Sequence, residues 1–350
     1  MRPSSPLVQA RGLRKHYAVA AGLWGRPGRC VRAVDGVDLD IGRAETLSLV
    51  GESGCGKTTL GRLLLRLVEP TAGQVFFDGV ELTALDRRSL RAQRRRMQLV
   101  FQDPYSALNP RSTAGAIVGE ALRIHGLADR RTVAGRVGEL LAMVGLPASC
   151  AGRYPHELSG GQRQRLGIAR ALAVGPEFIV ADEPVSALDV SVRAQIVNLM
   201  QDLQEKLRLT YLFIAHDLGV VRHIADRVAV MYLGRIVEVA TGPELYREPR
   251  HPYTRALLAA APVPDPRVRR RRLGLTGDAP DPAAVPSGCP FHPRCAEREA
   301  RCARVVPRLQ DPGDGHLTRC LLRQTGADAD EQTAGDSLAR GRHEQETCEP

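Results

Sequence analysis

The sequence predicts an α/β fold built on a mainly parallel sheet, in a chain of 350 residues. Two observations predict it: a glycine-rich loop between an apolar run and a helical pattern, at residues 46–65, and apolar runs that alternate with helical patterns up to about residue 245. Parallel strands that are buried on both faces are continuous apolar runs in sequence, and helices usually connect them. The length suffices for one large domain and an appendage.

The glycine-rich loop has the pattern G-x-x-x-x-G-K-T and lies between a predicted strand and a predicted helix. Its glycines allow backbone N–H groups to turn inward around phosphate oxygens, and the helix N-terminus adds its positive end. We therefore expect a nucleotide phosphate site in which Lys57 bridges the β- and γ-phosphates and Thr58 holds Mg²⁺. The residues expected to contact the nucleotide are Gly51, Glu52, Ser53, Gly54, Cys55, Gly56, Lys57, Thr58 and Thr59.

A second short pattern, Leu-Ser-Gly-Gly-Gln at residues 158–162, predicts the start of a helix that runs to Ala173. The Ser159 hydroxyl and the bare N–H groups of such a start can face an anion, and a helix N-cap without a ligand is the alternative. The pattern resembles the signature of the ATP-binding-cassette (ABC) ATPases. The resemblance implies a RecA-like P-loop core, with ATP and Mg²⁺ as cofactors and a helical subdomain that carries the signature.

The resemblance also implies a set of catalytic residues after the predicted strands. The apolar run 178–181 ends in Asp182, which supports Mg²⁺ in the family, and Glu183, which polarises the attacking water. One acid for the metal and one for the water suits a reaction catalysed by positioning and charge stabilisation. Two acids at the N-terminus of a helix are the alternative. By the same resemblance, Gln102 joins the metal shell and His216 contacts the γ-phosphate.

Further nucleotide contacts are implied for a facing protomer and for the adenine. In the family the signature closes over the γ-phosphate of the opposite subunit, and the residues that match it are Ser159, Gly160, Gly161 and Gln162. Asp189 lies in a segment that is similar to the D-loop, which touches that subunit. Tyr17 is the candidate for the ring that stacks on adenine, and a strand-edge core aromatic is the alternative.

Within the ABC ATPases, four segments resemble the ATPases of oligopeptide and dipeptide importers: residues 101–111, 154–158, 251–258 and 286–295. The segment 182–189 and the intact signature are similar to the second of the two ATPase subunits that such importers carry. The resemblance implies ATP hydrolysis coupled to peptide translocation, at the cytoplasmic face of a bacterial membrane. It implies two transmembrane permease subunits, a second ATPase subunit in a heterodimer rather than a homodimer, and an indirect extracytoplasmic peptide-binding protein.

Other functions compete with peptide import. One is a soluble ABC ATPase that acts on nucleic acid or ribosomes, but such proteins carry two cassettes or a coiled-coil insertion and this chain has neither. Another is an ABC importer of a different solute, such as nickel. A third is a module that uses ATP only to dimerise, which the presence of Glu183 and His216 disfavours.

The charge and the hydropathy of the chain limit the kinds of partner that we expect. The net charge is +10, and no basic groove is interleaved with aromatic residues, so we expect no nucleic-acid partner. No apolar run approaches the length of a transmembrane helix. Residues 17–25 faintly resemble a signal peptide, but cleavage near Ala21 would remove a predicted first strand, so we expect none.

The chain divides into a core, an extension and a tail. We expect an ABC ATPase domain at residues 1–250, with its helical subdomain at about 103–165, and a C-terminal extension of the oligopeptide-importer type at 251–321. The extension is rich in proline and cysteine and has little periodicity. Residues 322–350 hold few large apolar side chains and are predicted to be disordered.

Four cysteines lie in the extension, Cys289, Cys295, Cys302 and Cys320, with the spacing C-x5-C-x6-C-x17-C. A cytosolic setting disfavours disulfides, and a small segment often needs a metal to fold. Zinc sites usually offer a tight C-x2–4-C pair, which is absent, whereas a [4Fe–4S] cluster accepts four thiolates at wider spacing. The family resemblance also points to a [4Fe–4S] cluster. Free thiols that pack as small apolar residues are the alternative.

Overall fold

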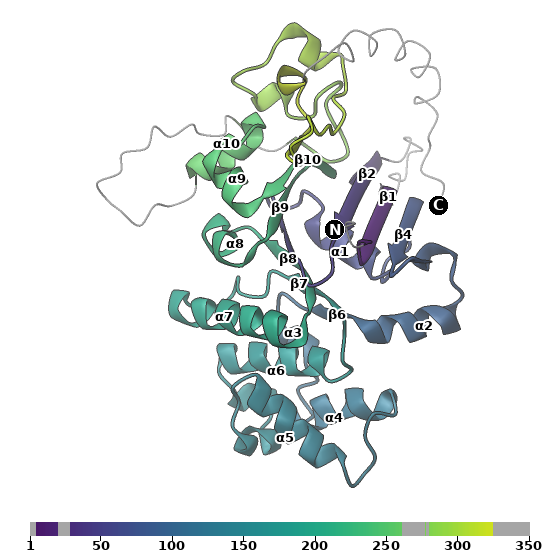
Figure 1. The fold of residues 1–350 in the computed structure, drawn as a ribbon, viewed down its shortest axis with the longest axis vertical. Coiled ribbons are helices and arrows are strands. Elements are labelled where there is room, and N and C mark those ends of the chain that lie inside the picture. The colour runs from purple at the N-terminus through teal and green to yellow at the C-terminus, as the bar shows by residue number, and fades with distance from the viewer. Residues whose placement is uncertain (1–4, 20–28, 261–276, 278–279, 325–350) are drawn as a thin grey trace. The chain divides into compact units, whose positions relative to one another are not determined.

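The computed structural model describes residues 5–19, 29–260, 277 and 280–324. The chain forms two compact units. The first unit comprises Met1–Val8, Ile41–Ser48 and Phe76–Ala215. The second unit comprises Gln9–Asp40, Leu49–Val75 and His216–Pro350. Figure 1 colours the ribbon by residue number.

The first unit is built on three parallel strands, β6 (Met97–Val100), β7 (Phe178–Asp182) and β8 (Thr210–Ala215). Val100 is paired with Ala181, and Asp182 with Ile214. All residues of β7 and β8 are buried, as expected for central parallel strands. The predicted buried runs are therefore confirmed, and the carboxyl ends of the three strands lie at one edge of the sheet.

Helices make up most of the rest of the first unit. A short strand β5 (Val80–Glu81) pairs antiparallel with Phe76 and Phe77. The helices are α2 (Arg87–Arg96), α3 (Pro104–Ala107), α4 (Ala114–Ile124), α5 (Val133–Met143), α6 (Gly160–Leu172) and α7 (Val190–Leu207). Helices α4, α5 and α6 pack against one another through buried aliphatic side chains, and α7 packs on α6 (Figure 1).

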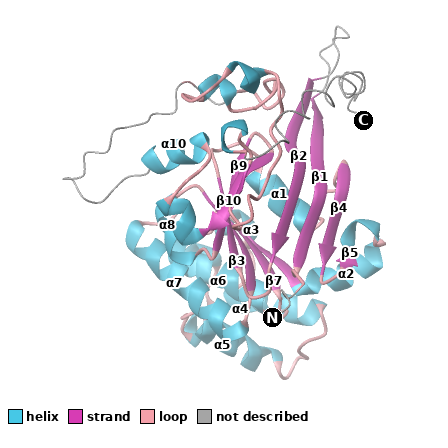
Figure 2. Ribbon diagram, turned by 45° about the horizontal axis from the view of Figure 1, so that its top comes forward, coloured by secondary structure: helices cyan, strands magenta, loops and turns pink. Residues whose placement is uncertain are grey.

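The second unit contains the long strands of a second sheet, in the order β2-β1-β4 (Figure 2). These strands are β1 (Val8–Val19), β2 (Arg29–Ile41) and β4 (Ala72–Phe77). The buried strand β3 (Thr46–Val50) leads into the glycine-rich loop, and α1 (Lys57–Leu64) follows it. The predicted succession of strand, loop and helix is confirmed.

The remainder of the second unit carries antiparallel strands and short helices. Strands β9 (Arg227–Tyr232) and β10 (Arg235–Thr241) form a hairpin, and β11 (Leu317–Thr318) pairs antiparallel with β10. The helices are α8 (Leu218–Ile224), α9 (Gly242–Arg247) and α10 (Pro252–Ala260), and 3-10 turns lie at His292–Arg294, Ala300–Ala303 and Leu321–Arg323. The predicted α/β class is confirmed, with antiparallel strands beside the parallel ones.

Two findings concern the ends and the hydropathy of the chain. Residues 325–350, which make up most of the predicted disordered tail, lie outside the described residues. Among the helices that the structure describes, none combines the length and the apolar character that a membrane crossing requires.

Candidate functional site

The glycine-rich loop between β3 and α1, residues 51–56, is called the phosphate loop below. Two of its glycines have positive φ and no room for a side chain. A Cβ on Gly56 (φ 106°) would lie 1.9 Å from the Ala33 carbonyl oxygen, and a Cβ on Gly51 (φ 154°) would lie 2.2 Å from that of Met231. Because only glycine fits both the backbone angle and the space, these positions fix the course of the loop.

Lys57 is the first residue of α1 and its side chain is buried. Its ammonium donates hydrogen bonds of 2.8 Å to the carbonyl oxygens of Gly51 and Glu52. A buried ammonium needs such partners, and here they hold the charge over the phosphate loop. The arrangement places a compact cation where the sequence predicts the phosphates.

The start of α1 leaves backbone donors for an anion. Gly56 is the N-cap residue and supplies no side-chain hydrogen bond to the first turn. Ser53 and Gly54 are exposed, and Thr58 and Thr59 are half-buried. N–H groups at a helix N-terminus beside an ammonium are the features expected of an anion site that binds phosphate.

Cys55 is the buried side chain of the phosphate loop. Burial raises the pKa of its thiol, against the opposing effect of the Lys57 ammonium. The thiol is therefore protonated at neutral pH and acts as a small apolar group there.

The two acids predicted after β7 lie at the carboxyl edge of the parallel strands of the first unit. Asp182 is the last residue of β7 and is buried. Glu183 follows it, and its Oε2 accepts a hydrogen bond of 3.1 Å from Gln102 Nε2. Gln102 follows β6, so neighbouring parallel strands bring the predicted amide and the predicted base together.

Glu183 has a left-handed backbone, with φ at 44°. Its N–H donates to the carbonyl of Ile214 on β8 at 3.0 Å, and its own carbonyl accepts from the N–H and the hydroxyl of Ser186. These bonds hold a conformation that costs about 1 kcal/mol or more for a residue with a Cβ. Strain of this kind is concentrated at functional sites.

The predicted signature opens α6. Ser159 is its N-cap residue, and its hydroxyl accepts from the N–H of Gln162 at 3.3 Å while Gln162 Oε1 accepts from the N–H of Ser159 at 3.0 Å. A Cβ on Gly161 would lie 2.6 Å from the Val192 side chain, and one on Gly160 would lie 3.4 Å from that of Leu188. The two glycines thus let α6 approach the start of α7 closely.

Three other predicted residues are placed as follows. Asp189 is exposed at the N-cap of α7 and makes no side-chain capping bond. His216 is exposed and directly follows β8. Tyr17 is 40% exposed on β1, with the Lys15 ammonium 5.0 Å from its ring centroid. An exposed ring of this kind is not the core aromatic that was the alternative for Tyr17.

The C-terminal extension, residues 251–321, contacts the phosphate loop within the second unit. Arg294 forms two hydrogen bonds with the Glu52 carboxylate, at 2.7 and 2.9 Å. The Tyr253 hydroxyl accepts from the N–H of Glu52 at 2.9 Å. Neither contact could be predicted from the sequence, because the partners are far apart along the chain and no local pattern joins them.

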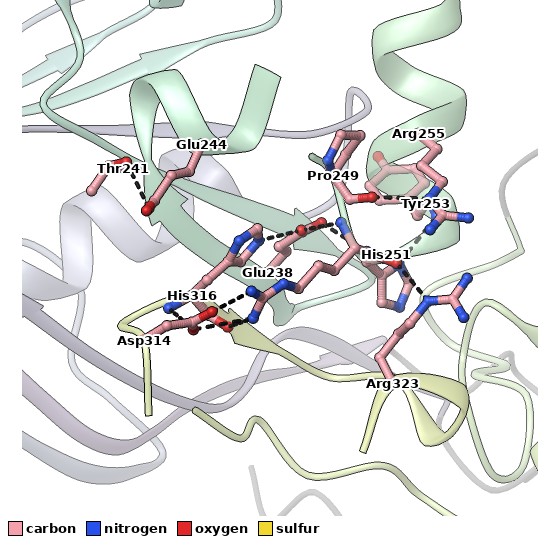
Figure 3. Close-up of polar contacts among 11 residues, drawn as sticks. Glu238, Thr241, Glu244, Pro249, His251, Tyr253, Arg255, Asp314, His316 and Arg323 are labelled. Atoms are coloured by element: carbon pink, nitrogen blue, oxygen red, sulfur yellow. Dashed lines mark hydrogen bonds and ion pairs between the residues drawn. The ribbon is translucent and has the colours of Figure 1, made fainter. Parts of the chain in front are cut away.

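A buried carboxylate anchors the start of the extension (Figure 3). Glu238 on β10 accepts from the N–H groups of Arg250 and His251, at 2.6 and 3.0 Å, and its Oε1 lies 2.7 Å from His316 Nε2. Burial opposes its charge, but the hydrogen bonds outweigh burial and hold the pKa of Glu238 below its ordinary value. Arg250 is also paired with Asp314.

The four cysteines of the extension line one small cavity, which we call the cysteine pocket: Cys289, Cys295, Cys302 and Cys320. His251, His292 and Phe291 are among its other lining residues. Burial raises the pKa of Cys289 to about 11. In the part of the chain that the structure describes, no three His, Cys, Asp or Glu side chains are placed to hold a single metal ion.

The predicted residues thus fall in both compact units. The phosphate loop, Lys57 and His216 belong to the second unit, and Gln102, Glu183 and the signature belong to the first. Within the units, the structure brings Glu183 to Gln102 and Lys57 to the phosphate loop.

Comparison with known proteins gives these sites a family context. Residues 34–186 match the family model described as ABC transporter, and residues 237–302 match the model described as oligopeptide/dipeptide transporter, C-terminal region. The ATP-binding cassette MJ0796, solved as a dimer in a post-hydrolysis state with ADP and Pi, has a TM-score of 0.60 and 32% identity to this chain. The match covers 67% of this chain and 98% of the cassette.

Relatives that match nearly the whole length of the chain identify its branch of the family. A putative peptide import ATP-binding protein of Brucella ovis is 53% identical over 91% of this chain and 98% of its own length. The oligopeptide transport ATP-binding protein AppF of Bacillus subtilis is 50% identical over 90% and 97%. The dipeptide transport ATP-binding protein DppF of Haemophilus influenzae is 48% identical over 92% and 98%. The chain therefore belongs to the ABC transporter family, as an ATP-binding subunit of its oligopeptide/dipeptide branch.

Proposed function

We propose that this chain hydrolyses ATP to energise the import of oligopeptides or dipeptides through separate membrane permease subunits. One observation carries the proposal: an ATP-type phosphate loop with a buried Lys57 occurs in one chain with a C-terminal region of the peptide-transporter type at residues 237–302. The phosphate loop supports the ATPase, and the C-terminal region supports peptides over nucleic acid, ribosomes or nickel.

ATP and Mg²⁺ are assigned to residues whose chemistry suits them. Lys57 and the N–H groups at the start of α1 bind the phosphates, and Tyr17 offers an exposed ring to the adenine. Oxygen ligands are those that Mg²⁺ prefers, and Thr58, Asp182 and Gln102 supply them. Mg²⁺ held by these residues would supply positive charge that offsets the negative charge of the phosphates.

Glu183 is assigned as the group that orients the attacking water and accepts its proton. The hydrogen bond from Gln102 orients the Glu183 carboxylate at the end of β7. His216 follows β8, the strand next to β7, and is assigned to the γ-phosphate, where an imidazole can donate a hydrogen bond.

The working form is a pair of cassettes. Ser159, Gly160, Gly161 and Gln162 of this chain close over the nucleotide of the facing cassette, and Asp189 touches that cassette. The exposed, glycine-rich start of α6 supports this role because it can approach a phosphate closely. ATP joins the pair and hydrolysis releases it. The MJ0796 cassette was solved as a dimer.

The partners follow from this role. The second cassette is a sister subunit in a heterodimer, and two permease subunits hold the pair at the cytoplasmic face of a bacterial membrane. An extracytoplasmic binding protein delivers the peptide to the permeases, so peptide itself does not contact this chain.

Peptide uptake tests the proposal. A strain of the source bacterium that lacks this chain should lose uptake of labelled di- and oligopeptides and regain it with the parent chain, while nickel uptake stays unchanged. A deletion strain that imports peptides at the parental rate, or loses nickel uptake instead, would contradict peptide import.

We also assign a [4Fe–4S] cluster to the cysteine pocket. Four cysteines around one cavity match the ligand number of such a cluster. A single zinc ion is usually bound by a tight C-x2–4-C pair, which these four cysteines lack. When bound, the cluster supplies a covalent staple for the extension.

Anaerobic purification tests the cluster. We expect brown protein with iron and sulfide near four each per chain, the stoichiometry of a [4Fe–4S] cluster. Colourless anaerobic protein, with stoichiometric zinc or with no metal, would rule the cluster out and leave the ATPase assignment intact.

A further inference from the structure

The strongest link between the C-terminal extension and the phosphate loop is the ion pair of Arg294 and Glu52. Each guanidinium nitrogen of the pair bonds a different carboxylate oxygen, at 2.7 and 2.9 Å. The Arg294 side chain is 6% exposed and that of Glu52 is 24% exposed. Bidentate pairs are the strongest of the charge-assisted hydrogen bonds, and partial burial protects this pair from screening by salt.

This pairing bears on ATP binding because the Glu52 side chain carries a negative charge. Glu52 is the second residue of the phosphate loop, and an unpaired carboxylate there would repel the phosphates. Arg294 both neutralises the carboxylate and fixes its position.

The backbone of Glu52 is held as well. Its N–H donates to the hydroxyl of Tyr253, which is fully buried on α10. The Tyr253 ring packs on Tyr232 and Phe291, with centroid distances of 4.7 and 5.4 Å. The extension therefore holds both the main chain and the side chain of the phosphate loop at one residue.

The turn that carries Arg294 is also part of the cysteine pocket. The 3-10 turn His292–Arg294 lies between Cys289 and Cys295. The His292 N–H donates to the Cys289 carbonyl at 3.0 Å, and the Cys295 N–H donates to the His292 carbonyl at 3.3 Å. Arg294 and the two cysteines therefore belong to one hydrogen-bonded stretch of chain.

We propose that Arg294 is a positioning residue of the ATP site, which keeps Glu52 neutralised and in place and couples the cysteine pocket to nucleotide binding. The proposal rests on the ATP site of the proposed function. The two sites are then linked thermodynamically. If a change in the cysteine pocket weakens or strengthens ATP binding by some factor, bound ATP disfavours or favours that change by the same factor.

Titration of the full-length protein with Mg-ATP tests the positioning role. We expect Arg294→Ala to weaken binding about tenfold, the effect of one lost charge-assisted pair. Arg255→Ala is the matched control, because Arg255 is paired with Glu297 in the same extension, away from the phosphate loop, and it should leave affinity unchanged. Adding Glu52→Gln to Arg294→Ala should restore most of the affinity, because it removes the uncompensated charge.

The rescue separates positioning from a structural role, since a fold damaged by Arg294→Ala would not be repaired by Glu52→Gln. Should Arg294→Ala fail to fold, Arg294→Lys keeps the charge and loses the bidentate geometry, and it should bind ATP at an intermediate affinity. Parental affinity in a folded Arg294→Ala, or no rescue by Glu52→Gln, would overturn the proposal. Lys57→Ala is the reference variant for the phosphate loop. If this variant bound ATP as well as the parent, the phosphate loop would not be the ATP site and the proposed function would be contradicted.

The coupling is tested with Cys295→Ser in two backgrounds. In the parent, we expect this variant to change the Kd for Mg-ATP at least about fivefold, the lower end of the usual range of coupling between sites. In the Arg294→Ala background the same change should have little effect, because the connection is already broken. An equal effect in both backgrounds, or none in the parent, would overturn the coupling.

Discussion

At the scale of single residues, Lys57 and Glu183 are both held by hydrogen bonds to other parts of the fold. Lys57 is one of few lysines in a chain whose basic residues are mostly arginine, and its ammonium is bonded to two carbonyl oxygens of the phosphate loop. Glu183 keeps a left-handed backbone because β8 and Ser186 bond both of its main-chain groups. Each residue is held before any ligand arrives, which lowers the cost of binding.

His251 gives a prediction on pH. It is fully buried, and burial lowers its pKa to about 4. Its Nδ1 accepts from the N–H of Tyr253, which requires the unprotonated nitrogen. Between about pH 6.5 and 4 the unfolded chain binds a proton at this residue and the folded chain does not, so stability falls as the pH falls. We expect His251 to contribute a loss of about 1.4 kcal/mol per pH unit in this window.

Urea unfolding of the parent and of His251→Asn from pH 7 to pH 4.5 measures this contribution. Asparagine keeps an acceptor near the Nδ1 position and does not titrate in this window. The free energy of unfolding should therefore depend less steeply on pH in the variant. Equal slopes for the two proteins would show that His251 is not a buried neutral imidazole.

At the scale of elements, the start of α6 combines a structural and a functional task. The reciprocal bonds of Ser159 and Gln162 form a capping box, which satisfies two N–H groups at the helix start. The same hydroxyl and glycines are assigned to the nucleotide of a facing cassette. The two tasks can be separated experimentally. Capping stabilises α6 in the isolated chain, whereas contact with the nucleotide of a facing cassette occurs only in the pair.

We expect Ser159→Ala to cost about 1 kcal/mol of stability, the usual cost of a lost N-cap. It should leave ATP binding by the isolated chain intact and should abolish most ATP turnover in the assembled transporter. Thr113→Ala is the matched control, because the Thr113 hydroxyl caps α4 in the same unit by accepting a hydrogen bond from the N–H of Ala116. Turnover that falls equally in the two variants would reduce Ser159 to a helix cap.

The elements also show which parts of the fold sequence reasoning reaches. β7 and β8 were predictable because a strand buried on both faces is a continuous apolar run. The extension was not, because it is held by contacts such as Glu238 with His316 and Glu52 with Arg294, whose partners are far apart along the chain. No periodicity records contacts of that kind.

At the scale of the whole molecule, the sequence motifs predicted the chemistry, and the fold supplied the contacts that connect the residues involved. The motif residues from Lys57 to Glu183 could be named from the sequence, because fixed spacing and flanking strands identify them. The left-handed backbone of Glu183 is a property of the tertiary structure. The same is true of the hydrogen bonds by which the extension holds Glu52. The chain is therefore expected to bind ATP alone and to hydrolyse it efficiently only with its partners.

ATP turnover by the assembled transporter with Glu183→Gln in this chain tests that account most directly. The amide is isosteric with the carboxylate but does not accept a proton from water, so ATP binding should persist and turnover should fall about a hundredfold or more. Glu177→Gln is the matched control, because Glu177 is paired with Arg96 just before β7, and it should keep the parental rate. Parental turnover in Glu183→Gln would contradict the assignment of the catalytic base.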